Sequence, residues 1–289
     1  MRSHFYLAVL GLLSLVFYIG LTVLSQDLNW GEGYSKRPIL EYLAVYFSLF
    51  FLYALACLFI FKSSWTKEKF WIIIAFGLLF RFAVIPSQQI QEDDVYRYLW
   101  DGKVFASGIN PFKFSPEEIN QYKSIKIQKP EYFRTHYDKN EQNELAILND
   151  LKWESDTALR YMERINHPDV PTIYPPLAQY VFRFSQQINT DSILTLRIFF
   201  LAFDLMGMIF IILALKTLNL NQNFSLVYFW SPLMIKETYN STHLDIIGIS
   251  CLCASLYFLL RKDMVGSIFF LALSVLGKFY SAVLLPFYL

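Results

Sequence analysis

Residues 92–102 read Glu92-Asp-Asp-Val-Tyr-Arg-Tyr-Leu-Trp-Asp-Gly102 and follow the apolar run from Phe70 to Pro86. That run is long enough to cross a membrane as a helix. Acidic residues at the end of a membrane-spanning helix are electrostatically costly, so their presence there indicates a specific role. A helix that starts at Asp94 places three polar residues on one face, at i+3, i+4 and i+7: Arg97, Tyr98 and Asp101. The stretch therefore predicts a helical membrane fold with a candidate site where the chain leaves the bilayer.

The composition fits a membrane protein. Hydrophobic residues make up 55% of the chain and charged residues 17%, whereas about a quarter of the residues in a soluble domain are charged. The net charge of +1 gives no basic field, so we expect no nucleic-acid partner. The cysteines Cys57, Cys251 and Cys253 lie in apolar runs without metal ligands beside them, and we expect them to be small core residues.

Apolar runs divide the chain into spans and a long polar loop. The expected spans are Phe5–Leu24, Ile39–Phe61, Phe70–Pro86, Ser192–Leu215, Phe224–Ile235, Leu244–Leu260 and Met264–Leu289. The last of these is either one span that contains Lys278 or two helices that turn at Gly277-Lys278. Residues 175–188 are too short to cross, and we expect an interfacial or re-entrant helix there. The polar loop is expected to carry one or two amphipathic helices around Asn140 to Ile165.

These expectations define an all-α fold, a polytopic integral membrane helical bundle with a long extracytoplasmic loop carrying amphipathic helices. Residues 1–86 would form N-terminal transmembrane helices, residues 87–190 the loop with its interfacial helices, and residues 191–289 the C-terminal transmembrane helices. Because the chain stops inside an apolar run, we expect the last part to be truncated.

The distribution of Lys and Arg predicts the orientation, since cytoplasmic turns carry an excess of these residues. The expected cytoplasmic segments are Arg2, the turn from Lys62 to Lys69, Lys216, and Arg261-Lys262. Parity then places the acidic block, the loop that ends near Tyr174, and the turn from Lys236 to His243 on the outer side. The candidate site residues would therefore lie at one face of the membrane.

Each candidate residue also has a plainer explanation. Asp93 and Asp94 could cap and neutralise a helix N-terminus, although capping accounts for one acid rather than for the pair with Arg97. His243 and Asp245 follow Thr242, and Thr242-x-x-Asp245 has the spacing of a capping box. These alternatives remain open.

Two further candidates lie in the second half of the chain. An ammonium group such as that of Lys278 in apolar surroundings pairs, snorkels or binds an anion. Tyr174 precedes Pro175-Pro176, which suits the first turn of a helix and favours a structural role there.

Sequence motifs of common hydrolases and nucleotide-binding enzymes are missing: there is no G-x-S-x-G, P-loop, G-x-G-x-x-G or H-E-x-x-H. An outward-facing carboxylate beside cations suits glycosyl transfer from a lipid phosphate. In that reaction one base activates the acceptor and the leaving phosphate needs charge stabilisation rather than a second, acidic carboxyl group.

The acidic block, with Gly108-Ile-Asn-Pro-Phe112, resembles the bacterial GT-C glycosyltransferases, in particular polyprenyl-phosphate-mannose-dependent mannosyltransferases. The resemblance continues in four shorter motifs: Ile165-Asn-His-Pro168, Ile173-Tyr-Pro-Pro-Leu-Ala-Gln179, His243-Leu-Asp245, and Gly277-Lys278 before Pro286. Together the motifs extend over roughly residues 70 to 289.

The resemblance implies an integral membrane enzyme of the bacterial inner membrane with its site on the outer face. It would move a sugar, mannose in the expected case, from a polyprenyl-phosphate donor to a glycan or glycolipid acceptor, with inversion. By motif position the general base is Asp94 or Asp93, and we favour Asp94. It implies no certain cofactor; a divalent metal at Asp93 and Asp94 stays open.

Substrate-binding roles are assigned to seven further residues: Arg97, Tyr98, Asp101, Tyr174, His243, Asp245 and Lys278. Of these, His243, Asp245 and Lys278 are our own assignment to the donor phosphate or the acceptor. A rival hypothesis is a transporter or flippase of a lipid-linked sugar, although such proteins often show repeated halves and charges near the middle of the membrane. A third is a membrane scaffold whose polar loop binds a partner.

Overall fold

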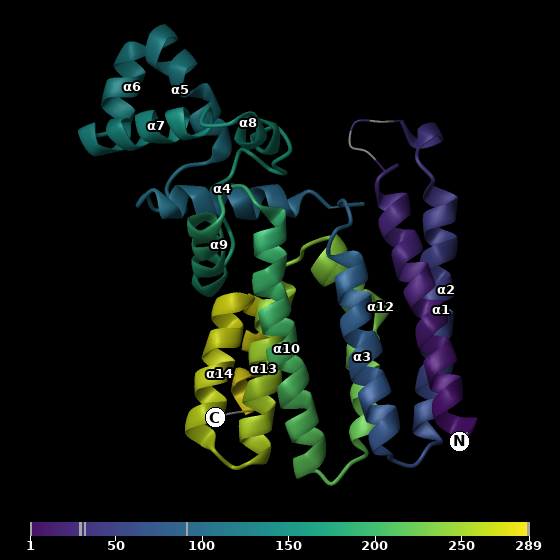
Figure 1. Cartoon of the computed structure of the whole chain (residues 1–289). Helices are drawn as coiled ribbons and strands as arrows, with labels where there is room; N and C mark the ends of the chain where they lie inside the picture. Colours follow the sequence, from purple (N-terminus) through teal and green to yellow (C-terminus); the bar gives the residue numbers. More distant parts are fainter. Residues whose placement is uncertain (1, 29–30, 32, 91, 288–289) are drawn as a thin grey trace. The chain divides into compact units, whose positions relative to one another are not determined.

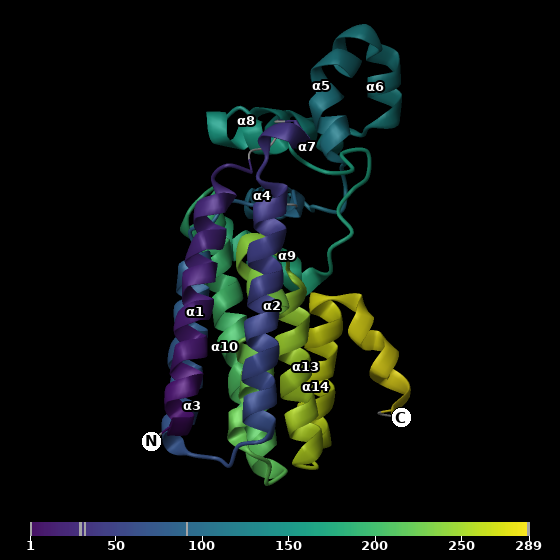
Figure 2. The same cartoon turned by 90° about the vertical axis from the view of Figure 1, so that its right-hand side faces the viewer.

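The computed structural model describes residues 2–28, 31, 33–90 and 92–287, and in this described part it contains helices and no strand. The predicted all-α membrane bundle is therefore confirmed. The chain divides into two compact units. Unit 1 comprises residues 1–92 and 197–289, and unit 2 comprises residues 93–196. Figures 1 and 2 show the helices of each unit.

Unit 1 contains the long apolar helices. Its elements are α1 (Arg2–Ser25), η1 (Tyr34–Lys36), α2 (Ile39–Phe61), α3 (Lys67–Val84), most of α10 (Ile193–Thr217), η2 (Gln222–Ser225), α11 (Leu226–Phe229), α12 (Pro232–Ile235), η3 (Lys236–Asn240), α13 (Asp245–Leu260), α14 (Met264–Gly277) and η4 (Phe279–Phe287). Three helices in the described residues are long and apolar enough to cross a membrane: His4–Ser25, Ile39–Phe61 and Ile193–Thr217. Two shorter apolar helices are α13 and α14.

The expected span from Phe224 to Ile235 is wrong as a continuous helix. The chain there forms the short pieces η2, α11 and α12, and then a single π-helical turn, η3. The break falls at Ser231-Pro232, because proline has no N–H and clashes with the carbonyl four residues earlier. The side chain of Ser231 restarts the chain as a cap, accepting a hydrogen bond from the backbone N–H of Met234.

The C-terminal stretch takes the second of its two expected forms. Helix α14 ends at Gly277, Lys278 is extended, and the 3-10 helix η4 begins at Phe279. At Gly277 an added Cβ would lie 3.1 Å from the backbone N of Gly248. Helices α13 and α14 therefore approach closely at two glycines, and Figure 1 shows them side by side.

A buried ion pair holds the core of unit 1. Arg81 of α3 lies 2.6 Å from Asp204 of α10, and both side chains are almost fully buried. Two phenol groups also donate to this carboxylate, Tyr239 at 2.6 Å and Tyr228 at 2.7 Å. Each charge is thus met by hydrogen bonds, as burial in an apolar interior requires.

Unit 2 consists of shorter, more polar helices: α4 (Asp94–Ala106), α5 (Pro116–Gln128), α6 (Pro130–His136), α7 (Lys139–Leu151), α8 (Asp156–Met162) and α9 (Pro176–Ile188). Helices α7 and α8 are the amphipathic helices expected around residues 140–165. Helix α4 packs against α9, and Val95, Leu99 and Gly102 of α4 are buried. A Cβ at Gly102 would lie only 2.5 Å from the carbonyl oxygen of Phe182, so this glycine sets the distance between the helices.

Candidate active site

Helix α4 begins at Asp94, as the sequence predicts. Asp93 occupies the N-cap position, but its side chain makes no capping hydrogen bond. It forms an ion pair with Arg164 instead, and the guanidinium of Arg164 lies 4.2 Å from the ring centroid of Tyr96. The capping explanation therefore fails for Asp93. Its carboxylate is instead paired with Arg164, which lies between α8 and α9.

Asp94 differs from its neighbour. Its side chain is half-buried, and among the residues that the structure describes it forms no hydrogen bond and no ion pair. The charge of Asp94 acts on the phenol of Tyr174. The pKa of Tyr174 is raised well above its usual value, mainly by burial and then by the negative charges of Asp94 and Asp101. Asp94 is thus an available carboxylate beside a neutral phenol.

Arg97 and Asp101 form a buried pair on the same helix. Arg97 Nε donates to Asp101 Oδ1 at 2.8 Å, and Arg97 Nη2 donates to the carbonyl oxygen of Val170 at 3.0 Å. Gln179 Nε2 donates to the other carboxylate oxygen at 3.3 Å. Burial raises the pKa of Asp101, against the opposing effects of the Arg97 charge and of hydrogen bonds from Thr172, Arg97 and Gln179. These two predicted site residues therefore hold α4 to the segment before α9.

Tyr98 and Tyr174 belong to one aromatic cluster. Their ring centroids are 4.8 Å apart in an edge-to-face arrangement, and Tyr98 also stacks on Phe182 of α9 at 4.7 Å. Tyr98 is fully buried, whereas Tyr174 is half-buried. Within unit 2 the predicted residues of α4 and Tyr174 are thus brought together, with Asp94 and Tyr174 the two that remain accessible.

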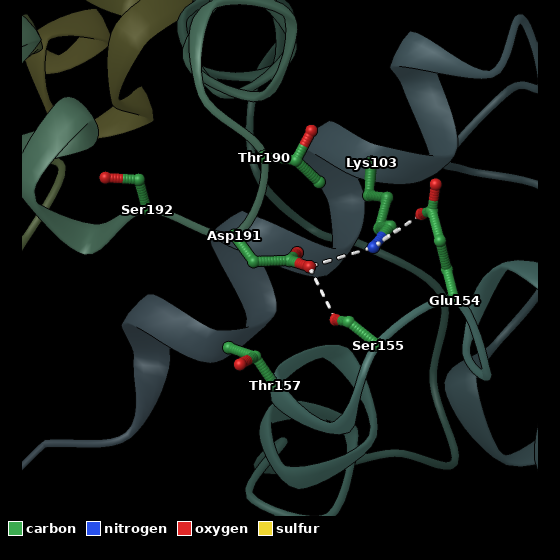
Figure 3. Close-up of a pocket in the computed structure, with 7 residues that line it drawn as sticks. All are labelled: Lys103, Glu154, Ser155, Thr157, Thr190, Asp191 and Ser192. Atoms are coloured by element: carbon green, nitrogen blue, oxygen red, sulfur yellow. Dashed lines mark hydrogen bonds and ion pairs between the residues drawn. The ribbon is translucent and has the colours of Figure 1, made fainter.

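A pocket of about 460 Å³ also lies in unit 2. At its centre Lys103 Nζ is 2.9 Å from both Asp191 Oδ2 and Glu154 Oε2 (Figure 3). Ser155 lies beside them, and its hydroxyl caps α8 while also lying 3.4 Å from Asp191. Lys103 is paired with both carboxylates, and its contact with Asp191 connects α4 to the segment that precedes α10.

The second group of predicted residues lies in unit 1, around the turn after η3. His243 Nδ1 is 2.9 Å from Glu237 Oε2, and His243 Nε2 is 3.9 Å from Glu92 Oε2. Lys236 Nζ lies 3.1 Å from the other oxygen of Glu237. Burial acts to raise the pKa of Glu237, but the hydrogen bond from His243 and the charge of Lys236 outweigh it and lower this pKa to about 2.

Asp245 and Lys278 also meet in unit 1. Lys278 Nζ donates to Asp245 Oδ2 at 3.1 Å, and both side chains are more than a third exposed. The pair joins the start of α13 to the turn after α14 and leaves the ammonium group open to an anion.

The turn itself is held by Arg197 rather than by a capping box. Arg197 Nε donates to Thr242 Oγ1 at 2.9 Å, and Nη2 donates to the carbonyl oxygen of Asn240 at the same distance. Helix α13 has no side-chain cap, and Thr242 has a positive φ of 59°. The capping-box interpretation of Thr242-x-x-Asp245 is therefore wrong, since the Thr242 hydroxyl accepts from a guanidinium.

Four important polar residues were not predicted from the sequence: Arg164, Arg197, Glu237 and Lys103. The positive charge of Arg197 near the start of an apolar helix was a usable signal, because such charges are costly in a membrane. The other three lie in polar stretches, where nothing in the pattern distinguishes them from solvated residues.

A divalent metal does not fit the carboxylates of this site as they stand. Within the described residues, no group of three or more His, Cys, Asp or Glu side chains is placed to hold a metal ion. Asp93, one of the two carboxylates expected at such a site, is paired with Arg164. No step of the proposed chemistry is therefore assigned to a metal.

Fold and site together define a helical membrane protein with an available carboxylate in one unit and a half-exposed group of charged residues in the other. Residues 166–289 match the model of the MptA_B family, described as alpha-(1->6)-mannopyranosyltransferase, N-terminal domain. This match bears out the resemblance to GT-C-like mannosyltransferases, and the enzyme class is glycosyltransferase. It includes Tyr174, His243, Asp245 and Lys278 and leaves out the acidic block. No curated protein and no solved structure matches the chain.

Proposed function

We propose that the protein transfers a mannosyl group from a polyprenyl-phosphate donor to a hydroxyl of a glycan or glycolipid acceptor, at the outer face of the bacterial inner membrane. Asp94 is the general base in this proposal. The family match supports a mannosyltransferase, while the donor, the acceptor, the face and the base are ours.

The observation that carries the proposal is the different state of the carboxylates near the start of α4. Asp93 and Asp101 are each paired with an arginine, whereas Asp94 forms no hydrogen bond or ion pair in the described part of the chain. A general base needs a lone pair directed at substrate, so a carboxylate held by a guanidinium is poorly suited to the role. Asp94 is the member of the block that is free to accept a proton.

The chemistry then needs a single displacement. Asp94 accepts the proton of the acceptor hydroxyl as its oxygen forms a bond to the anomeric carbon of the donor. The bond from that carbon to the phosphate oxygen breaks, and the polyprenyl phosphate leaves with the electron pair. Because the attack comes from the face opposite the leaving group, the configuration at the anomeric carbon is inverted. The developing negative charge on the phosphate requires cations.

In unit 1, Lys278 is our candidate to hold the donor phosphate or the acceptor. Its ammonium group is paired with Asp245 but more than a third exposed, and a lysine has three N–H donors, so it can bind a phosphate without leaving its partner. In the same unit, the His243–Glu237 pair would orient an acceptor or donor hydroxyl. Tyr174 would contact the acceptor near Asp94. Arg97, Tyr98 and Asp101 act as positioning residues, because the contacts they make in unit 2 hold α4 in place.

The ends of the unit 1 helices support the proposed orientation. The C-terminal ends of α2, α10 and α13 lie at one end of the unit 1 helices (Figure 1). Lys216 is in the last turn of α10, and Lys62 and Arg261-Lys262 directly follow α2 and α13. His243 and Glu237 lie at the opposite end, where Asn240 binds the turn after α3 through Ser87. Since cytoplasmic turns are rich in Lys and Arg, the His243 end is assigned to the outer face.

The test is the transfer of radiolabelled mannose from polyprenyl-phosphate mannose by the purified protein in lipid nanodiscs. We expect Asp94→Asn to reduce the rate by about 10²-fold or more, the usual contribution of a general base. Asp94→Glu should retain part of the activity, because it keeps a carboxylate.

Asp156→Asn is the matched control, since Asp156 begins α8 as Asp94 begins α4. It should leave the rate unchanged. Transfer by Asp94→Asn at the wild-type rate, with the protein folded, would remove Asp94 as the base. Loss of transfer in both variants would point to a structural defect in unit 2 and would equally count against the assignment.

A further inference from the structure

Unit 2 contains a second pocket that the proposed chemistry does not use. It has a volume of about 310 Å³ and lies between the turn that follows α4 and the start of α9. Its walls include Phe105, Ile109, Phe112, Pro176, Gln179 and Tyr180. A volume of this size lies at the lower end of the range for small-molecule sites. Two of the sequence motifs noted above, residues 108–112 and 173–179, thus meet at one cavity.

One residue of this pocket's wall, Gln179, has an unsatisfied side-chain atom. Gln179 is 1% exposed, and its side-chain oxygen Oε1 has no hydrogen-bond partner within the described residues. Its amide nitrogen is fully used, donating to Thr172 Oγ1 at 2.9 Å and to Asp101 Oδ2 at 3.3 Å. A buried acceptor without a donor is destabilising, so a ligand that supplies the donor gains from binding there.

The orientation of this amide is fixed by its neighbour. Asp101 already accepts from Arg97, and a carboxylate offers only acceptors to the amide of Gln179. Turning the amide over would place two oxygen atoms against each other. The NH₂ group therefore faces Asp101, and the carbonyl oxygen is left for another donor.

The other walls are aromatic and open. Tyr180 is 48% exposed and Phe112 is 44% exposed, and the ring of Tyr180 packs edge-to-face on Phe105 with centroids 5.2 Å apart. Aromatic faces carry partial negative charge and attract groups with partial positive charge. A hexopyranose ring has such groups: its C–H bonds gather on one face, and its hydroxyl groups lie around the edge.

We infer that this pocket is a binding subsite for a hexopyranose ring, which lies on Tyr180 and Phe112 and donates a hydroxyl hydrogen to Gln179 Oε1. A purely apolar occupant, such as an isoprenoid chain, would leave that oxygen without a donor. The inference rests on the proposed function for the source of the sugar, which is either the donor or the acceptor.

Saturation-transfer NMR with methyl α-D-mannopyranoside tests binding without requiring activity. With wild-type protein in nanodiscs we expect magnetisation transfer to the ring protons of the sugar. Tyr180→Ala and Phe112→Ala should each reduce this signal at least twofold, and Tyr180→Phe should retain it. Tyr132→Ala is the matched control, because Tyr132 is 47% exposed and lies outside the pocket.

Two results would overturn the inference. One is the absence of transfer to the sugar with wild-type protein. The other is a sugar signal that Tyr180→Ala and Phe112→Ala leave unchanged. This result overturns the inference even if the two variants bind sugar-free polyprenyl phosphate more weakly than wild type. Loss of mannosyl transfer in Asp94→Asn has no bearing on this experiment, so failure of the proposed function and failure of the subsite are separable.

Kinetics of transfer then identify the source of the ring. If Tyr180→Ala raises the KM for polyprenyl-phosphate mannose several-fold with kcat retained, the subsite holds the donor sugar. If it raises the KM for the acceptor instead, the subsite holds the acceptor. A wild-type KM for both substrates would contradict a role in substrate binding.

Discussion

Charged residues in this protein differ chiefly in what neutralises them. Asp93 is paired with Arg164, and Asp204 accepts from Arg81 and two phenols, so neither carboxylate is available to a substrate. Asp94 lacks such a partner in the described structure. In the Asp245–Lys278 pair, both side chains are partly exposed to solvent. Availability rather than the mere presence of charge therefore separates the candidate catalytic residues from those that hold the fold.

Glu237 predicts a pH dependence of stability at the residue scale. Its pKa is lowered from 4.5 to about 2 in the folded protein, so the unfolded state binds more protons between these values. Its contribution to stability is complete above about pH 4.5 and is lost as the pH falls towards 2. One pKa unit corresponds to about 1.4 kcal/mol, which limits the effect to roughly 3.5 kcal/mol.

Thermal unfolding in detergent between pH 3 and pH 7 measures this contribution. We expect Glu237→Gln to unfold at a lower temperature than wild type at pH 7, and the difference to shrink as the solution is acidified. A constant difference across that range would show that the Glu237 charge does not supply the stability.

At the scale of helices, the contact of α4 with α9 depends on one glycine. A methyl group at Gly102 would lie 2.5 Å from the backbone oxygen of Phe182, so Gly102→Ala must push the two helices apart. Overpacking of this kind typically costs 1–3 kcal/mol, and we expect Gly102→Ala to lower the unfolding temperature and the transferase rate together.

The comparison for that variant is Gly20→Ala in α1, where an added Cβ meets nothing within 4 Å. Alanine favours a helix over glycine by up to about 1 kcal/mol, so this change should be neutral or stabilising. Equal behaviour of the two variants would contradict the close packing at Gly102.

The same elements show what sequence patterns can and cannot predict. The start of α4 at Asp94 follows from residue spacing, and the short helix α9 follows from the length of its segment; both are local properties. The break at Pro232 also had a local signal, but the length of the apolar run outweighed it. Arg81 lies inside an apolar run, and its partner Asp204 lies on a helix far along the chain. Which carboxylate stays unpaired, Asp94 or Asp93, depends on such distant partners and could not be derived from the pattern.

For the whole molecule, the question is whether the Arg81–Asp204 pair stabilises the fold or takes part in transport. A charged residue whose hydrogen bonds are all made to other groups of the protein is suited to a structural role. Removing one partner of a buried ion pair destabilises a protein by about 3–5 kcal/mol. We expect Arg81→Met to lower the unfolding temperature strongly. If Arg81→Met folds as stably as wild type and yet changes movement of a lipid-linked sugar across vesicles, the transporter hypothesis would gain the support that it now lacks.

Orientation is also a property of the whole molecule. If the Lys-rich turns face the cytoplasm, a cysteine at Ser63 should react with a membrane-impermeant maleimide only after the cells are permeabilised. A cysteine at Asn140 at the start of α7, outside the apolar helices, should react in intact spheroplasts. Cys57, Cys251 and Cys253 lie within apolar helices and provide the low background in unsubstituted protein. The reverse labelling pattern would place the candidate site on the cytoplasmic face, where a cytoplasmic sugar donor would have to replace the externally presented lipid-linked one.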